Sequence, residues 1–188
     1  MSDLKVIQKI LIENASPEGK AAHEKFVPGL EKAYGTRAPV INALAKQYKD
    51  RDFDLVEELW QGEHIEEKIL AAKLLGQIAK KNPEKTLTLI KKFSKDISDW
   101  AVCDTLGMQA PKKLNKSHAK EIFQISNALI QSKNLWQRRL ALVLVEWYTR
   151  DKKFHPAIKQ LVKIVENDKE YYVKKAVVWI NRNFSKGR

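Results

Sequence analysis

The sequence lacks several features that would point to particular protein classes. Cys103 is the single cysteine in 188 residues, which excludes an intrachain disulfide and a metal site built from cysteines alone. The four histidines lack the spacing of metal ligands. No stretch is apolar for long enough to span a membrane, and the charged N-terminal segment is unlike a signal peptide. We therefore expect a cytoplasmic protein that needs neither a metal nor a cofactor.

Acidic residues are few relative to basic ones. Lys and Arg number 35 and Asp and Glu number 23, which gives a formal net charge of +12. Hydrophobic residues make up 44% of the chain, so the positive charge belongs to a folded protein rather than to a disordered basic tail. Such an excess attracts polyanions such as nucleic acids, although a lysine-rich solvated surface gives the same balance.

Glycine is also scarce, with 7 residues, and no segment has the pattern of a β-hairpin. Apolar residues instead recur at three- and four-residue spacing almost throughout, which is typical of amphipathic helices. Pro39, Pro83 and Pro156 stand where the first turn of a helix would begin, and Ser117 and Asn134 are candidate N-caps. The pattern predicts an all-α chain of about ten or eleven helices joined by short loops.

The helical pattern repeats with a period of 36 residues. The repeated segments begin at His64, Trp100, Trp136 and Tyr172. They share an apolar column formed by Leu70, Leu106, Leu142 and Val178. A further helix fits into each interval, over residues 83–93, 117–131 and 156–167. The period predicts an α-solenoid, a stack of helix pairs with a concave surface, in one domain over residues 1–188. On the face opposite the apolar column, aromatic, acidic and basic residues predict a wet groove.

One stretch of this face is unusual for a soluble helix. In SDWAVCDTLG, residues 98–107, Trp100 and Asp104 stand four apart and so lie one turn apart on one helix face. A carboxylate among apolar and aromatic side chains is in a perturbed environment, which is a mark of functional sites. The alternative is a structural ion pair between repeats, with Lys68 or Arg139 as the partner of Asp104.

Four segments taken together resemble a known family. They are YGTRAP (34–39), DWAVCDT (99–105), LWQRRLAL (135–142) and YYVKKAVVWINRN (171–183). In this order they are similar to the DNA alkylation repair family built from HEAT-like repeats, the AlkD type of alkylpurine DNA glycosylase. The resemblance covers almost the entire chain and implies an α-solenoid of HEAT-like helix pairs with a concave basic groove.

The resemblance also implies roles for individual residues. The family's catalytic aspartate falls on Asp104. Its groove residues fall on Trp100, Arg139, Trp179 and, near the N-terminus, Phe26. Basic residues in or near these segments are candidate contacts to the DNA backbone, namely Arg37, Arg138 and Lys175. Trp60 and Trp147, like most tryptophans, are expected to serve packing.

The activity implied by the resemblance is removal of N3- or N7-alkylated purines from duplex DNA, without base flipping. Such a base is positively charged and already a good leaving group. Breaking its bond to deoxyribose builds oxocarbenium character, which a fixed carboxylate stabilises, as in glycoside hydrolysis. The expected protein is a monofunctional, monomeric glycosylase that needs no cofactor, bound to duplex DNA with alkylated bases and so associated with the nucleoid.

Two other functions fit part of the sequence. A non-catalytic HEAT-like protein could bind distorted or branched DNA through the same basic groove. Many helix-pair arrays are instead scaffolds for other proteins. The charge of +12 argues against a scaffold, and Asp104 argues against a simple DNA binder, because a carboxylate facing phosphates would weaken binding.

Overall fold

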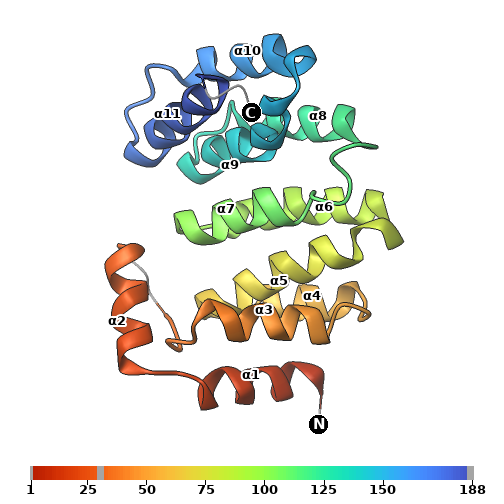
Figure 1. Cartoon of the computed structure of the whole chain (residues 1–188), viewed down its shortest axis with the longest axis vertical. Helices are drawn as coiled ribbons and strands as arrows, with labels where there is room; N and C mark the ends of the chain where they lie inside the picture. The colour runs from red at the N-terminus through yellow and green to blue at the C-terminus, as the bar shows by residue number, and fades with distance from the viewer. Residues whose placement is uncertain (1, 29–31, 186–188) are drawn as a thin grey trace.

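The computed structural model describes residues 2–28 and 32–185, which form a stack of helices (Figure 1). The α-helices are α1 (Asp3–Glu13), α2 (Pro17–Phe26), α3 (Ala38–Gln47), α4 (Phe53–Trp60), α5 (Ile65–Ile78), α6 (Pro83–Phe93), α7 (Trp100–Gln109), α8 (Ala119–Leu129), α9 (Leu135–Val145), α10 (His155–Val165) and α11 (Tyr171–Ser185). Short 3-10 helices are η1 (Ala79–Lys81), η2 (Ser94–Asp96), η3 (Glu146–Arg150) and η4 (Lys152–Phe154). Within these ranges there is no β-strand, so the all-α prediction is confirmed.

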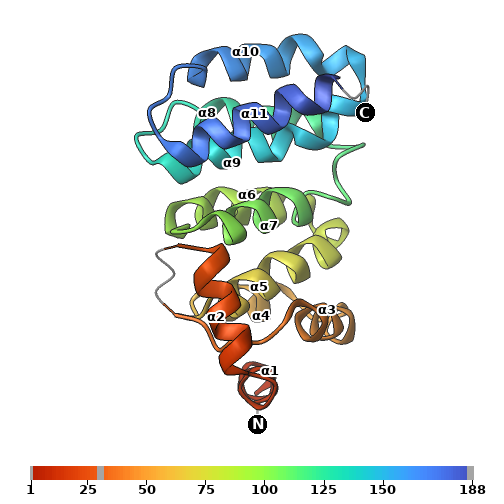
Figure 2. The same ribbon diagram turned by 60° about the vertical axis from the view of Figure 1, so that its left-hand side comes forward.

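The helices form two layers along the stack. Helices α5, α7, α9 and α11 contact one another in succession and make the inner layer. Helices α4, α8 and α10 cover α5 and α9 from the other side, and α6 contacts α8 in the same outer layer (Figure 2). This alternation of inner and outer helices is the α-solenoid that the period predicts. In the described part of the chain, no helix combines the length and apolar character of a membrane span.

Helix α2 departs from this regular stacking. It stands steeply against the other helices and reaches from α1 towards the N-terminal end of α7 (Figures 1 and 2). Ser16 caps it and Pro17 opens it, yet the only residue of the helix that is buried is Gly19. Residues 32–37, which are not helical, lead into α3. The N-terminal part of the chain therefore covers one end of the inner layer.

Local sequence signals explain where most helices begin. Pro39, Pro83 and Pro156 all lie in first helical turns, as predicted. Asn134 caps α9 by accepting a hydrogen bond from the Trp136 N–H at 2.8 Å. The predicted cap at Ser117 is wrong: α8 begins after His118, because the Ser117 hydroxyl hydrogen-bonds the His118 ring instead.

The repeat alignment is correct for three of its four copies. Leu70, Leu106 and Leu142 are fully buried in one continuous core, but Val178 is 63% exposed. Helix α11 buries Ile180 and its i−4 neighbour Ala176 instead. Among the described residues no helix follows α11, so the side of it that a further repeat would cover faces solvent. The last copy therefore turns a different face to the core.

The face predicted to line a groove is only partly open. Trp100, Trp136 and Tyr172, at the starts of the repeated segments, are half-buried. Cys103 and Leu140, about one turn further along, are fully buried. Helices α7 and α9 each pack against an inner helix on both sides, so they leave only a narrow stripe exposed.

Two glycines allow the inner helices to approach closely. A side chain at Gly76 of α5 would collide with the backbone carbonyl of Gln109, at the end of α7. A Cβ atom at Gly107 of α7 would lie 2.6 Å from Cγ1 of Val143 on α9, well inside van der Waals contact. The lack of a side chain at these positions sets the spacing between successive repeats.

Truncation of the apolar column tests this core. Leu106→Ala should lower the free energy of unfolding by about 2–5 kcal/mol, because the side chain is fully buried and leaves a cavity. Val178→Ala, at the aligned but exposed position, should change it by less than about 0.5 kcal/mol. Urea denaturation of both variants checks the pair. Equal destabilisation would contradict the exposed placement of Val178.

Candidate functional site

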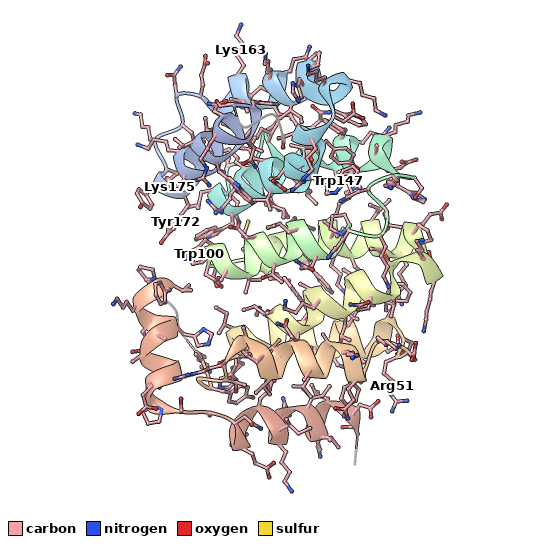
Figure 3. The ribbon with its side chains drawn as sticks, viewed as in Figure 1. Arg51, Trp100, Trp147, Lys163, Tyr172 and Lys175 are labelled. Atoms are coloured by element: carbon pink, nitrogen blue, oxygen red, sulfur yellow. The ribbon has the colours of Figure 1, made fainter. Side chains whose placement is uncertain are left out.

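A cavity of about 350 Å³ lies where the N-terminal ends of three inner helices meet α2. We call it the near cavity. Its lining comes from α2 and the residues after it, from α7 and α9, and from α11, as follows: Lys25, Phe26, Pro28, Trp100, Arg139, Tyr171, Tyr172 and Lys175. Figure 3 shows Trp100, Tyr172 and Lys175 close together beside α2. Aromatic surfaces and cations therefore converge on one opening, as the sequence predicts for a groove.

Arg139, which lines this cavity, forms a two-pronged ion pair with Asp104, which is not itself part of the lining. The Arg139 Nε donates to Oδ1 of Asp104 at 2.8 Å, and Nη2 donates to Oδ2 at 2.7 Å. The Arg139 side chain is 8% exposed and that of Asp104 is 19% exposed. This parallel geometry fixes the plane of the carboxylate. Of the two partners that the sequence offers for Asp104, the structure therefore selects Arg139.

The same guanidinium reaches a third helix. Nη1 of Arg139 donates to the backbone carbonyl of Tyr172 at 2.6 Å. One side chain thus joins α7, α9 and α11 at the near cavity. Arg139 lines the cavity, but most of its hydrogen-bonding capacity is directed to protein rather than to solvent.

Trp100 connects α7 to α2. Its indole N–H donates to the backbone carbonyl of Phe26 at 2.8 Å. The Phe26 ring is 65% exposed, an unusual state for a large apolar side chain. Trp100 and Phe26 also line a second, neighbouring cavity of about 420 Å³, where exposed Arg37 contributes a cation.

Other predicted site residues lie further from the near cavity. Trp179 is half-buried on α11 but lies outside the lining. Arg138 points away from its neighbour Arg139 and pairs with Asp168, with Nε–Oδ2 at 2.6 Å and Nη2–Oδ1 at 3.2 Å. Lys175 is exposed at the rim of the cavity. The structure brings Trp100, Arg139, Phe26 and Lys175 together at the near cavity, and Asp104 is joined to them through Arg139.

Sequence reasoning missed a buried carboxylate that holds the N-terminal part of the site. Glu66 of α5 is fully buried, and its oxygens accept hydrogen bonds from the backbone N–H groups of Tyr34, Gly35 and Thr36 at 2.8–3.1 Å. The His23 ring lies 3.7 Å from the same carboxylate. Glu66 thereby fixes residues 34–36, which lead into α3. Its only sequence signal is an acidic residue inside an apolar helix.

The two arginine–aspartate pairs made by α9 differ in their electrostatics. Burial raises the pKa of Asp104 above the ordinary value of 3.8, against the opposing effect of the hydrogen bonds from Arg139. Burial acts in the same direction on Asp168, but hydrogen bonds from Arg138 and the Glu170 N–H outweigh it and lower the pKa. Asp104 exposes a larger fraction of its side chain than Asp168, 19% against 8%, but more protein surrounds it between the inner helices. A carboxylate shifted in this direction beside a cavity is a mark of functional sites.

In residues 2–28 and 32–185, no group of three or more His, Cys, Asp or Glu is placed to hold a metal ion.

Residues 7–188 match a family model described as DNA alkylation repair enzyme. A solved structure described as a predicted DNA alkylation repair enzyme from Enterococcus faecalis superposes with a TM-score of 0.80. It shares 21% sequence identity over 93% of this chain and 84% of that chain, a likeness that shows the fold alone. No curated protein matches the chain.

Removal of one partner from the buried pair tests its structural weight. Asp104→Ala should cost about 3–5 kcal/mol of unfolding free energy, because the Arg139 charge is then buried without its partner. The double variant Asp104→Ala/Arg139→Met should regain part of this loss, since no unpaired charge remains. Thermal and urea unfolding of the cycle measure both effects. A double variant as unstable as the sum of the two single variants would show that the two residues are not coupled.

Proposed function

Because the chain belongs to the family of DNA alkylation repair enzymes, we propose that it is an AlkD-type DNA glycosylase that acts on duplex DNA. Its substrates are purines that carry a positive charge after alkylation at N3 or N7. The observation that carries this proposal is the Asp104 carboxylate, which is held by Arg139, a residue of the near-cavity lining, and which retains 19% exposure. The proposed reaction is hydrolysis of the bond between base and deoxyribose, with no cleavage of the DNA strand.

Hydrolysis of this bond requires little of the protein beyond a fixed negative charge. An alkylated cationic purine leaves with the bonding electron pair and becomes neutral, so no general acid is required. The deoxyribose C1′ becomes positively charged, and Asp104 stabilises that charge electrostatically. Water then forms a bond to C1′ and loses a proton to solvent or to Asp104. Arg139 acts as a positioning residue, since its two hydrogen bonds hold the carboxylate in one plane.

Trp100 and the surrounding cations supply affinity for the damaged strand. The face of the half-buried Trp100 ring attracts the cationic base or sugar by about 0.5–2 kcal/mol. Lys25 and Lys175 at the cavity rim are suited to DNA phosphates, and Arg37 of the neighbouring cavity extends the positive surface. A phosphate contact by Arg139 and roles for Trp179 and Arg138 stay predictions.

We propose that the lesion reacts without entering a deep pocket. The near cavity is wide and lies at the surface where the ends of four helices meet, unlike the enclosed pockets that hold flipped bases. In this mode the charge and lability of the lesion itself provide most of the selectivity. The protein would act as a monomer along the DNA backbone.

A second candidate function is DNA binding through the same groove without catalysis. In a non-catalytic protein that binds distorted or branched DNA, Asp104 and Arg139 would form only a structural link between α7 and α9. Their mutual neutralisation and the low exposure of Arg139 favour this reading. The two functions differ in whether free base is released.

Release of 7-methylguanine from methylated duplex DNA decides between them. The wild-type protein should release free base under single-turnover conditions, and Asp104→Asn should reduce the rate by roughly 10²–10³-fold, the scale of one preorganised electrostatic group. Asp168→Asn is the matched control, because it alters the pair made by the neighbouring Arg138, neither member of which lines the near cavity, whereas Arg139 does. That variant should retain activity. A wild-type protein that binds DNA but releases no base would favour the non-catalytic function.

The raised pKa of Asp104 predicts a specific pH dependence. Excision requires the ionised carboxylate, so its rate should rise with pH through a midpoint above 3.8. The difference between wild type and Asp104→Asn, measured from pH 3.5 to 7, isolates this effect. An identical acid limb in the two proteins would exclude Asp104 as its source.

A further inference from the structure

The first turns of α9 and α11 meet through two aromatic rings. The rings of Trp136 and Tyr172 have their centroids 5.0 Å apart and their planes tilted by 34°. Both residues are half-buried, and they stand at the starts of successive repeats. Tyr172 lines the near cavity, whereas Trp136 is not part of the lining. The ring contact therefore reaches the candidate site from outside its lining.

Trp136 connects the same three helices as Arg139. The two residues are three apart on α9, so they share one face of the helix. Sγ of Cys103, the residue before Asp104 on α7, donates weakly to the Trp136 backbone carbonyl at 3.6 Å. The Trp136 ring packs on Tyr172, whose own carbonyl accepts from Arg139. Trp136 thus contacts α7 and α11 one turn before Arg139 does, close to the groups that Arg139 holds.

The start of α11 depends on contacts with α9, because no described helix covers its other side. The buried residues of α11 form a stripe along one face of the helix, with Val173, Ala176 and Ile180 among them. A stripe of small or branched apolar side chains leaves the helix some rotation about its axis. The ring contact at Tyr172, about 100° around the helix from Val173, restricts this rotation. The rotation in turn sets where the Tyr172 carbonyl meets Nη1 of Arg139.

The ionisation of Asp104 reports on how well Arg139 is placed. Burial raises the pKa of Asp104, and the hydrogen bonds from Arg139 oppose this effect. On the same helix, Asp99 and the Cys103 thiol are the titratable groups that interact with this carboxylate, and Lys68 of α5 acts on Asp99 instead. When Arg139 loses its bond to α11, its bonds to Asp104 become longer and less planar, so the pKa of Asp104 rises further.

We infer that Trp136 and Tyr172 are positioning residues that act through Arg139, an inference that rests on the proposed function. Their ring contact fixes the start of α11 against α9, which places the Tyr172 carbonyl for Nη1 of Arg139. Nε and Nη2 of Arg139 then stay in the plane of the Asp104 carboxylate. The carboxylate therefore meets the deoxyribose in one orientation, as a preorganised electrostatic group must. Trp136 does this from outside the cavity lining.

The Trp136→Leu variant tests this role in the protein without DNA. Isotope labelling of the aspartate carboxyl groups and NMR titration from pH 3.5 to 7 give the pKa of Asp104, whose signal is the one missing from Asp104→Asn. Loss of the Trp136 ring should raise this pKa, because Arg139 then opposes the effect of burial less well. Trp136→Phe keeps a ring in contact with Tyr172 and should keep the wild-type pKa.

Trp147→Leu is the matched control. Trp147 is also half-buried and also packs on a tyrosine, with its ring centroid 5.1 Å from that of Tyr148. Figure 3 shows Trp147 well away from Tyr172, towards the opposite end of the inner layer. This variant should lose stability to a similar extent and leave the pKa of Asp104 unchanged. An equal rise of that pKa in both leucine variants would reveal a general loosening of the fold and overturn the inference.

Tyr172→Leu removes the other ring and keeps the backbone carbonyl, so it tests the contact even where Trp136→Leu does not fold. It should raise the pKa of Asp104 in the same way. The double variant should raise it little further, because either change alone breaks the contact. A pKa of Asp104 that is unchanged or lowered in a folded single variant would contradict the role of the ring pair.

Single-turnover release of 7-methylguanine separates this inference from the proposed function. Trp136→Leu should release base roughly tenfold more slowly at saturating protein, with an unchanged half-saturating concentration, because the carboxylate shifts while the DNA contacts remain. Its rate should also rise with pH through a higher midpoint than that of wild type. A protein that shows the rise in pKa but releases no base would refute the glycosylase and keep the link from Trp136 to Asp104. Release by Trp136→Leu at the wild-type rate and pH midpoint would refute the positioning role alone.

Discussion

The hydrogen bonds of the Arg139 guanidinium hold the candidate site together. They reach a carboxylate on α7 and a backbone carbonyl on α11 from a position on α9, so three successive repeats meet at one side chain. A solenoid gains most of its stability from contacts between adjacent repeats, and its inner surface is only as rigid as those contacts. A planar, permanently charged group with several fixed donors is suited to this task, whereas a lysine in its place would hold the carboxylate at a single point.

Successive arginines on α9 show how one motif serves two different purposes. Adjacent residues on a helix point about 100° apart, so Arg138 and Arg139 contact different partners. Arg138 pairs with Asp168 in the loop before α11, where the ion pair lowers the pKa of the carboxyl and fastens a connection between helices. Arg139 pairs with Asp104 between the inner helices, where burial raises the pKa. Similar geometry therefore lowers the pKa of the carboxyl in one pair and leaves it raised in the other.

Periodicity predicted the helices and the stacking, because both depend on apolar residues that recur at fixed intervals. It failed at Val178, since the core-facing side of a last helix depends on what lies beyond it. Spacing also placed Trp100 and Asp104 on one face, but it left the partner of Asp104 open. Lys68 lies instead over the Trp60 ring, at 5.5 Å. Which of the two basic residues pairs with Asp104 therefore depends on the rotation of α5 relative to α7. The position of α2 and the buried carboxylate of Glu66 have no periodic signal, because each arises from tertiary contacts.

Most hydrogen bonds between repeats join residues about one period apart, such as Trp60 with Asp96 and Glu146 with Asn183. The bond from Trp100 to Phe26 is different, because it joins residues 74 positions apart. Contacts within one period close short loops and can form in any order along the array, whereas a contact across two periods must wait until the intervening helices have assembled. Helix α2 is therefore expected to dock late in folding, and its amide protons should exchange with solvent sooner than those of α7.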